Sequence, residues 1–220
     1  MARSSYGTHN NPVKNDREKN DGDRWNKKYR EASAATWTAP DPFLPWAFSQ
    51  YISPMFPRGG YALDFAGGAG RHAVWLAKQG WEVTLIDISD IGVDLARQSA
   101  GLVGSNVHFV VDDLTQFKAS QTQFDLAMVF FYLDRDIFSQ IVKSIKPGGL
   151  LIYKTNAVTP DRRMDEGRNP AYLLKAGELL QLLPPWADMR VLHYHEDTSE
   201  KATAELVARK EIEATGKAYK

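Results

Sequence analysis

The chain has 220 residues, of which 43% are hydrophobic and 25% charged, a composition that suits one globular domain with a full core. Lys and Arg together number 27, as do Asp and Glu, so a surface built for broad electrostatic binding to nucleic acid or anionic membrane is disfavoured. The absence of cysteine excludes disulfides, zinc–thiolate sites and cysteine nucleophiles.

The N-terminal segment 1–23 is polar and has few large apolar groups, so we predict a flexible tail ahead of a single domain at 24–220. It has no apolar core of the kind that a signal peptide needs, and no apolar run in the chain reaches membrane-spanning length. We therefore expect a cytoplasmic protein without a membrane partner.

Two helices are predicted between this tail and the first strand. In the segment 24–32, Trp25 and Tyr29 are spaced i,i+4 and so share one helical face. The segment 41–57 opens with an Asp-Pro pair at 41–42, which is typical of a helix cap and first turn, and prolines end it.

From residue 61 onward, segments with strand character alternate with segments of helical character. The predicted strands are 61–66, 81–89, 106–114, 124–133, 150–157, 189–197 and 203–211. The predicted helices are 71–80, 89–102, 134–149 and 176–185. This order predicts an α/β fold with a doubly wound, seven-stranded, mostly parallel sheet that ends in an antiparallel hairpin. Ligands bind such sheets at the carboxyl ends of the strands, where the strand order reverses.

A glycine-rich loop, 65–70, follows the first strand and opens a helix. Gly68, Gly70 and Ala73 formally meet the dinucleotide fingerprint G-x-G-x-x-G/A, and Asp87 at the end of the second strand is placed for a ribose. An NAD(P)-dependent oxidoreductase on a Rossmann sheet is therefore one hypothesis.

Three features of the strand ends favour a different ligand. Asp64 precedes the loop, where a carboxylate would repel a pyrophosphate but tolerate a cation. Asp112 and Asp113 follow the third strand and can accept from an adenine amino group. The aromatic run 130–132 ends the fourth strand and suits a sulfonium. S-adenosylmethionine, with adenosine at one end and a charged amino acid at the other, fits these features better than a dinucleotide.

Five segments resemble the ordered motifs of class I S-adenosylmethionine-dependent methyltransferases: LDFAGGAG, LIDIS, VVDDL, FDLAMVFFYL and IKPGGLLIY. The resemblance extends from about Trp25 to the end of the chain and implies a Rossmann-like sheet, S-adenosylmethionine as cofactor and methyl transfer. The segment RNPAYLLKAGELLQLL is similar to the tellurite-resistance (TehB-like) type of small-molecule methyltransferase. Ala66 departs from the common D/E-x-G-x-G-x-G pattern, and we expect alanine there only if its φ is negative.

The resemblance implies a set of cofactor-binding residues. They are Asp64, Ala66, Gly67, Gly68, Gly70, Asp87, Ile88, Asp112, Asp113, Leu114, Phe130, Tyr29 and Arg30. Asp64 is expected to support the methionine end, and Asp87 to bind the ribose diol with Ile88 against the adenine. Tyr29 and Arg30 are expected to close over the methionine carboxylate.

The same resemblance implies roles at the third and fourth strands. Asp113, or its neighbour Asp112, is expected to meet the adenine amino group, with a backbone N–H from Leu114. Phe130 is expected beside the reacting methyl group. Apart from the resemblance, Phe131 and Tyr132 are expected near the acceptor. The loop after the fifth strand carries Arg162, Arg163 and Arg168, which either bind an anionic acceptor or are solvated loop charges.

No catalytic residue and no metal site are predicted. His193 and His195 share one face of a predicted strand, whereas Glu196 points to the other, so only two metal ligands would be aligned. His72 lies in a first helical turn, which is typical of a packing or capping histidine.

The acceptor is predicted to be a small molecule and not nucleic acid. The fourth strand ends in FFYL and has no N-P-P-Y motif, and there is no cysteine for attack on a pyrimidine. A thiol or a chalcogen oxyanion such as tellurite would need no strong base, which is compatible with the lack of an obvious one. The sequence leaves the oligomeric state open.

Overall fold

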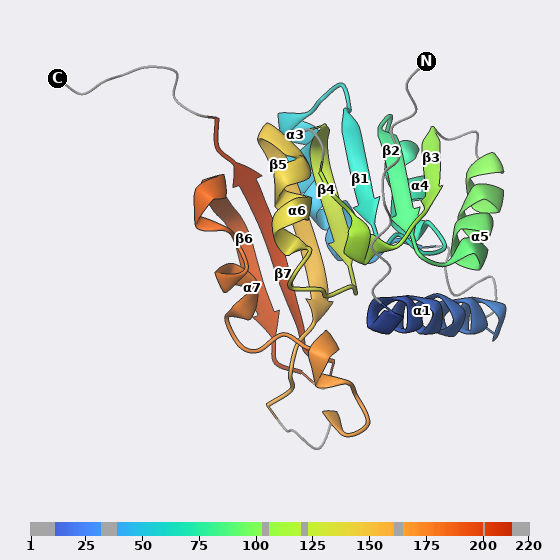
Figure 1. Ribbon diagram of the computed structural model, residues 1–220. Helices are drawn as coiled ribbons and strands as arrows, with labels where there is room; N and C mark the ends of the chain where they lie inside the picture. The colour runs from blue at the N-terminus through green and yellow to red at the C-terminus, as the bar shows by residue number, and fades with distance from the viewer. Residues whose placement is uncertain are drawn as a thin grey trace, which may run out of the picture.

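A computed structural model describes residues 12–31, 39–102, 106–119, 123–160, 165–199 and 201–212. Its strands form one seven-stranded sheet in the order β3-β2-β1-β4-β5-β7-β6 (Figure 1). The strands are β1 (Tyr61–Phe65), β2 (Glu82–Asp87), β3 (Val107–Val111), β4 (Phe124–Phe130), β5 (Ile145–Asn156), β6 (Met189–Asp197) and β7 (Thr203–Lys210). Neighbours among β1 to β5 are parallel, whereas β7 is antiparallel to both β5 and β6. The predicted mostly parallel sheet with a C-terminal hairpin is confirmed.

Helices cover both faces of this sheet (Figure 1). The α-helices are α1 (Pro12–Glu31), α2 (Phe43–Ala47), α3 (Ser53–Met55), α4 (Arg71–Ala77), α5 (Asp90–Gly101), α6 (Phe138–Ser144) and α7 (Glu178–Gln181). The other helical segments are the π-helix η2 (Phe48–Ile52) and the 3-10 helices η3 (Leu114–Gln116), η5 (Pro170–Tyr172) and η6 (Pro185–Ala187). No helix in the described ranges is both long and apolar enough to cross a bilayer.

Alternate residues of the central strands supply two separate cores. Leu126 and Met128 of β4 pack with α2, α4 and α5, whereas Ala127 and Val129 pack with α6 and α7. A strand buried on both faces needs a nearly continuous apolar run, which is why the segment 124–130 is apolar almost throughout.

The helix α1 crosses the expected boundary between the tail at 1–23 and the domain at 24–220. It begins at Pro12 within that segment, while residues 1–11 lie outside the described part of the chain. The helix is tied to the domain further along: Ser89 Oγ donates to Asn26 Oδ1 at 2.6 Å. Because the residues before Trp25 lack apolar i,i+4 pairs, periodicity gave no sign of this earlier start. The single-domain division itself stays a prediction.

The helix expected at 134–149 is much shorter, which is a correction to the sequence analysis. Asp134 Oδ1 accepts from Asp136 N at 2.9 Å, so the first residues form a turn before α6 begins. At the other end β5 starts at Ile145, and a register shift against β4 accommodates Gly148, whose φ is +84°. A glycine in this left-handed region cannot continue a helix.

Candidate functional site

Two adjoining cavities lie at the carboxyl ends of the parallel strands, where α1 crosses below the sheet (Figure 1). The strand order reverses at this edge between β1 and β4, as expected for a ligand site. We call the cavity of about 310 Å³ beside the glycine loop the inner cavity, and the cavity of about 480 Å³ between α1 and the loop after β4 the outer cavity. Their shared wall consists of Trp25, Lys28, Ile88, Leu114, Phe131, Tyr132 and Asn156.

The glycine loop is shaped by contacts that leave no room for side chains. At Gly68, whose φ is +54°, an added Cβ would lie 2.0 Å from the hydroxyl oxygen of Tyr29. At Gly67 it would lie 2.9 Å from Asp64 Oδ2. Gly67 and Gly68 line the inner cavity, so backbone is exposed to a ligand there. Gly70 lines neither cavity; it begins α4 at φ +78°.

Ala66 lines the inner cavity with φ at +60°, so the expectation of a negative φ was wrong. The chain keeps the left-handed turn that the missing glycine would have made. An alanine in this region costs about 1–2 kcal/mol relative to an ordinary conformation. The loop therefore stores local backbone strain directly at the cavity.

Asp64 lies behind the glycine loop and lines neither cavity. Its side chain is 1% exposed, and Oδ2 accepts from Ala73 N at 3.0 Å. Burial raises the pKa of Asp64 to about 7; the carboxylate of Asp87 adds to the rise and the Ala73 N–H opposes it. The carboxyl group thus supports the loop from beneath and does not line the cavity itself.

Asp87 ends β2 and faces the inner cavity. Oδ2 accepts from Gly68 N and Oδ1 from Ser89 N, both at 2.8 Å, so the carboxylate also fixes the glycine loop. Burial raises the pKa of Asp87, while these N–H groups lower it. Each carboxylate oxygen keeps acceptor capacity for a further hydroxyl, as a ribose diol requires.

Ile88 and Leu114 line both cavities, at the ends of β2 and β3. Asp113 lines the outer cavity, and its carboxylate accepts from Thr115 N at 3.0 Å as the cap of η3. Asp112 lines neither cavity, and its Oδ1 accepts from Asp113 N. Of the two aspartates, Asp113 is the one that lines a cavity.

The end of β4 forms the wall between the glycine loop and the outer cavity. Phe130 stacks on His72 with ring centroids 4.0 Å apart and lines the inner cavity. Phe131 and Tyr132 line both cavities. Phe131 has φ at +58°, and its N–H donates to Lys154 O at 2.8 Å. A residue with a strained backbone conformation therefore lines both cavities.

The helix α1 supplies more of the site than the sequence analysis expected. Tyr29 is 8% exposed and covers Gly68, and burial is the main cause that raises its pKa. Arg30 is exposed and lines neither cavity. The positively charged residue of this helix that lines both cavities is Lys28, with Nζ 4.3 Å from the centroid of the Trp25 ring. The i,i+4 spacing of Trp25 and Tyr29 was the feature of the sequence that could have indicated which face of α1 lines the inner cavity.

Two residues at the start of α4, and Asn156 at the end of β5, were missed as site residues. Arg71 lines the inner cavity and lies over the ring of Phe131 at 5.6 Å. His72 also lines it, with Nε2 accepting from Asp41 N at 3.2 Å. Burial lowers the pKa of His72 well below its ordinary value, so the ring is neutral with its proton on Nδ1.

The arginines expected near the acceptor do not line the cavities in the described ranges. Arg168 pairs with Asp165 at 2.9 Å and lines neither cavity. Arg162 and Arg163 lie outside the described residues.

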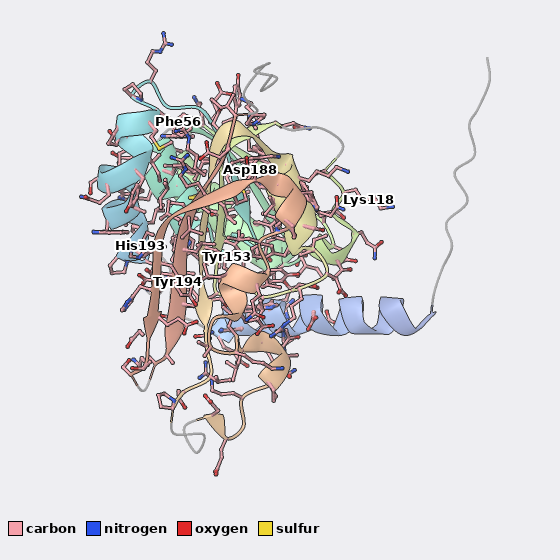
Figure 2. All side chains as sticks on the ribbon, turned by 90° about the vertical axis from the view of Figure 1, so that its left-hand side faces the viewer. Phe56, Lys118, Tyr153, Asp188, His193 and Tyr194 are labelled. Carbon is pink, nitrogen blue, oxygen red and sulfur yellow. The ribbon has the colours of Figure 1, made fainter. Side chains whose placement is uncertain are left out.

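His193 of β6 lies in a different region, away from α1 (Figure 2). The ring of His193 lies 4.5 Å from that of Trp46, and its Nε2 is 3.9 Å from Glu205 Oε2. Glu196 accepts from Gly177 N at 2.7 Å and from the hydroxyl of Tyr194.

These residues fit S-adenosylmethionine. The cradle at Gly67 and Gly68 gives a ligand access to backbone, and Asp87 offers carboxylate oxygens where a ribose would lie. Lys28 and Arg71 face the same cavity and match the charge of an amino-acid carboxylate.

Comparison with known proteins agrees with this geometry. Residues 62–149 match the family described as "Methyltransferase domain". YqeM of Bacillus subtilis, which is named as a methyltransferase, is 26% identical over 125 residues, covering 53% of this chain and 49% of YqeM. The ribosomal protein L11 methyltransferase of Symbiobacterium thermophilum is 25% identical over 129 residues, covering 58% of this chain and 42% of that protein. The chain spans about half the length of the curated relatives it matches.

Solved methyltransferase structures share the fold. The N-methyltransferase NodS from Bradyrhizobium japonicum, in complex with S-adenosylhomocysteine, has a TM-score of 0.65 at 18% identity, covering 87% of this chain and 98% of NodS. TehB from Haemophilus influenzae has a TM-score of 0.64 at 18% identity, covering 86% of this chain and 67% of TehB. At such identities the likeness extends to the fold and does not single out the tellurite-resistance type. Residues 62–149 therefore match a methyltransferase-domain family, and the seven-stranded sheet has the fold of solved methyltransferases.

Proposed function

We propose that the chain transfers a methyl group from S-adenosylmethionine to a small-molecule acceptor bound in the outer cavity. The observation that carries this proposal is the shared wall: Phe131, Tyr132 and Asn156 face both the glycine-loop cavity and a second cavity of about 480 Å³. An enzyme that brings two reactants together needs adjoining cavities of this kind.

In this proposal the inner cavity and the ends of β2 and β3 hold the cofactor. Asp87 accepts from the ribose diol, Ile88 and Leu114 contact the adenine, and Asp113 accepts from its amino group. Lys28 and Arg71 bind the methionine carboxylate, with Tyr29 closing the loop; Arg71 takes the place that the sequence analysis gave to Arg30. Support comes from the cavity lining and from the polar groups that each side chain presents.

The chain's contribution to the reaction is alignment. A bound sulfonium supplies an activated methyl group, so the protein mainly has to hold the acceptor in line with it. The backbone of Phe131, held by the hydrogen bond to Lys154 O, fixes the wall where the two ligands meet. His72 is a poor candidate for a base, because the Asp41 N–H already occupies its accepting nitrogen.

A thiol or tellurite acceptor remains a candidate from the sequence. Such acceptors need no strong base. The observation against an anionic acceptor is that Arg168, which was expected to bind it, is paired with Asp165 instead.

Radiolabelled methyl transfer to a panel of thiols, tellurite, amines and phenols tests the proposal. Label in at least one small acceptor is the expected result. Tight binding of S-adenosylhomocysteine without transfer to any member would indicate a cofactor-binding protein without this activity.

Asp87→Ala tests the placement of the ribose. We expect the affinity for S-adenosylhomocysteine to fall by about 1–3 kcal/mol, because charged hydrogen bonds are lost. Calorimetric titration measures this change, and an unchanged affinity would show that the ribose lies elsewhere.

A further inference from the structure

The outer cavity has an acidic lining. Its carboxylates come from Asp21, Asp113, Asp134 and Asp136, and its cations from Arg24 and Lys28. The other walls are largely aromatic or aliphatic, and the cationic Arg24 lies 5.9 Å from the ring centroid of Trp25 and 5.3 Å from that of Tyr172. The outer cavity therefore combines an apolar lining with more negative than positive side chains.

Of the carboxylates that line the outer cavity, those without an ion pair among the described residues lie mainly on the loop after β4. Arg24 Nη2 pairs with Asp21 Oδ1 at 3.1 Å, so these charges offset each other. Asp113 caps η3 beside the proposed adenine position. Asp134 and Asp136 remain on the loop between β4 and α6, where Asp134 Oδ1 accepts from Asp136 N and offers its other oxygen.

The arginine between these two aspartates does not line the cavity. Arg135 Nε donates to Glu178 Oε1 at 2.6 Å, and its other nitrogens donate to the carbonyls of Ala171 and Leu173. The guanidinium group of Arg135 therefore binds Glu178 and the segment around Tyr172. Asp134 and Asp136 are therefore not neutralised by their sequence neighbour.

Carboxylates that line the outer cavity also affect the pKa of the Tyr132 hydroxyl group. Burial is the first cause that raises its pKa, and the carboxylates of Asp134, Asp113 and Asp21 raise it further. Carboxylates from three separate segments thus act on one point of the shared wall. An anion brought to this point would be repelled, whereas a cation would be attracted.

We propose that the outer cavity recognises acceptors that carry an amine or another cationic group, with Asp134 and Asp136 facing the charge and the side chains of Tyr132 and Leu133 against the apolar body of the acceptor. This rests on the proposed function, since it names the acceptor class of the same site. Aromatic faces and carboxylates both favour a cation, and the space is partly shielded from water. An anionic thiolate or tellurite would face the same charges unfavourably.

Binding of matched ligand pairs to the protein saturated with S-adenosylhomocysteine tests this. Each pair has the same body and opposite charge: phenethylamine against 3-phenylpropanoate, and tyramine against 3-(4-hydroxyphenyl)propanoate. We expect the amine of a pair to bind at least about tenfold more tightly than the carboxylate at 0.15 M salt. The double variant Asp134→Asn with Asp136→Asn should lower that ratio at least about fivefold.

Controls separate the possible outcomes. Glu82→Gln with Asp94→Asn removes two exposed carboxylates that do not line the cavity and should leave the ratio unchanged. The absence of a cation preference in both pairs, or a ratio unaffected by the double variant, would overturn the inference. So would a double variant that weakens S-adenosylhomocysteine itself, because the aspartates would then serve the cofactor. A wild-type chain that fails to bind S-adenosylhomocysteine would instead contradict the proposed function.

Discussion

The inner and outer cavities are built by different means. On one side the inner cavity is formed by backbone: a glycine loop, its left-handed turns at Ala66 and Gly68, and one carboxylate that holds the loop. The outer cavity is formed by side chains from α1, the loop after β4 and the turn η5. A backbone cradle accepts one kind of ligand and tolerates little change, whereas a wall of side chains can be altered residue by residue. We therefore expect the glycine loop to determine which cofactor binds, and the side chains of the outer cavity to determine which acceptor binds.

The strongest test of the backbone cradle is Gly68→Ala. The added Cβ would lie 2.0 Å from the Tyr29 hydroxyl oxygen at a φ of +54°. We expect the affinity for S-adenosylhomocysteine to fall at least about a thousandfold, or about 4 kcal/mol, because loop and helix must move apart. Calorimetric titration measures the loss.

Gly80→Ala is the matched control for this variant. Gly80 has φ at +89° but nothing within 4 Å of an added Cβ. It should cost about 1–2 kcal/mol of stability through strain and leave cofactor affinity unchanged. Equal effects of the two variants would show that backbone strain, and not the contact with Tyr29, sets the result.

The second test concerns the carboxyl group beneath the loop. Because the folded state raises the pKa of Asp64 to about 7, the folded chain holds a proton that the unfolded chain releases at lower pH. This contribution to stability is fully present below the ordinary pKa of 3.8 and is lost as the pH rises through about 7. It amounts to at most about 4 kcal/mol for a shift of this size.

Urea unfolding at a series of pH values between 4 and 8 measures this loss. Asp64→Asn keeps an acceptor for the Ala73 N–H but cannot titrate, so its stability should fall less over the same range. Asp87, whose pKa is also raised, contributes a decline of the same sign in both proteins. Identical pH profiles for the two proteins would contradict the account of Asp64.

The outer cavity should respond to Arg135→Lys without any effect on the cofactor. Arg135 holds the segment around Tyr172 through Glu178 and two backbone carbonyls. A lysine cannot make this forked set of bonds, so we expect KM for the best acceptor of the panel to rise by a factor of about 5–10, roughly 1 kcal/mol.

Steady-state kinetics separate the two cavities in this variant. KM for S-adenosylmethionine should stay constant while KM for the acceptor rises. Arg97→Lys, at an exposed pair with Asp94, is the control and should change neither constant. A parallel rise in both constants would show that the two cavities are not independent.

The smallest expected effect is a gain in stability from Ala66→Gly. Glycine relieves the strain of a φ at +60°, and this gain exceeds its larger loss of backbone entropy, for a net stabilisation of about 1 kcal/mol or less. Urea unfolding measures it. Ala69→Gly, in the same loop but without a positive φ, should destabilise; stabilisation by both variants would argue against strain at Ala66.

The two cavities also differ in how far the sequence predicts them. Asp87, Ile88 and the glycines follow strands within a short stretch of chain, so strand order and local motif were enough to bring them together. The left-handed turn at Ala66 was missed, because only tertiary contacts reveal that an alanine bears the strain there. All seven strands were predicted. The errors in the predicted elements lay at their ends, such as the start of the helix α1 and the start of the strand β5.

The outer cavity could not be predicted in this way. Asp21, Asp134 and Tyr172 come from three distant segments, and no periodicity in the sequence links them. Acceptor contacts were expected from the arginine-rich loop after β5, whereas Arg168 forms an ion pair with Asp165. Arg135 carries no motif, yet its bonds place Tyr172 at the cavity. Sites made from such long-range contacts require the fold itself.

Competitive calorimetry with S-adenosylhomocysteine and NAD⁺ on the purified chain tests the central claim most directly. The account predicts micromolar or tighter binding of S-adenosylhomocysteine, roughly 8 kcal/mol or more, with no heat from the dinucleotide. If the chain bound the dinucleotide and did not bind S-adenosylhomocysteine, the account would be contradicted and the oxidoreductase hypothesis would be favoured.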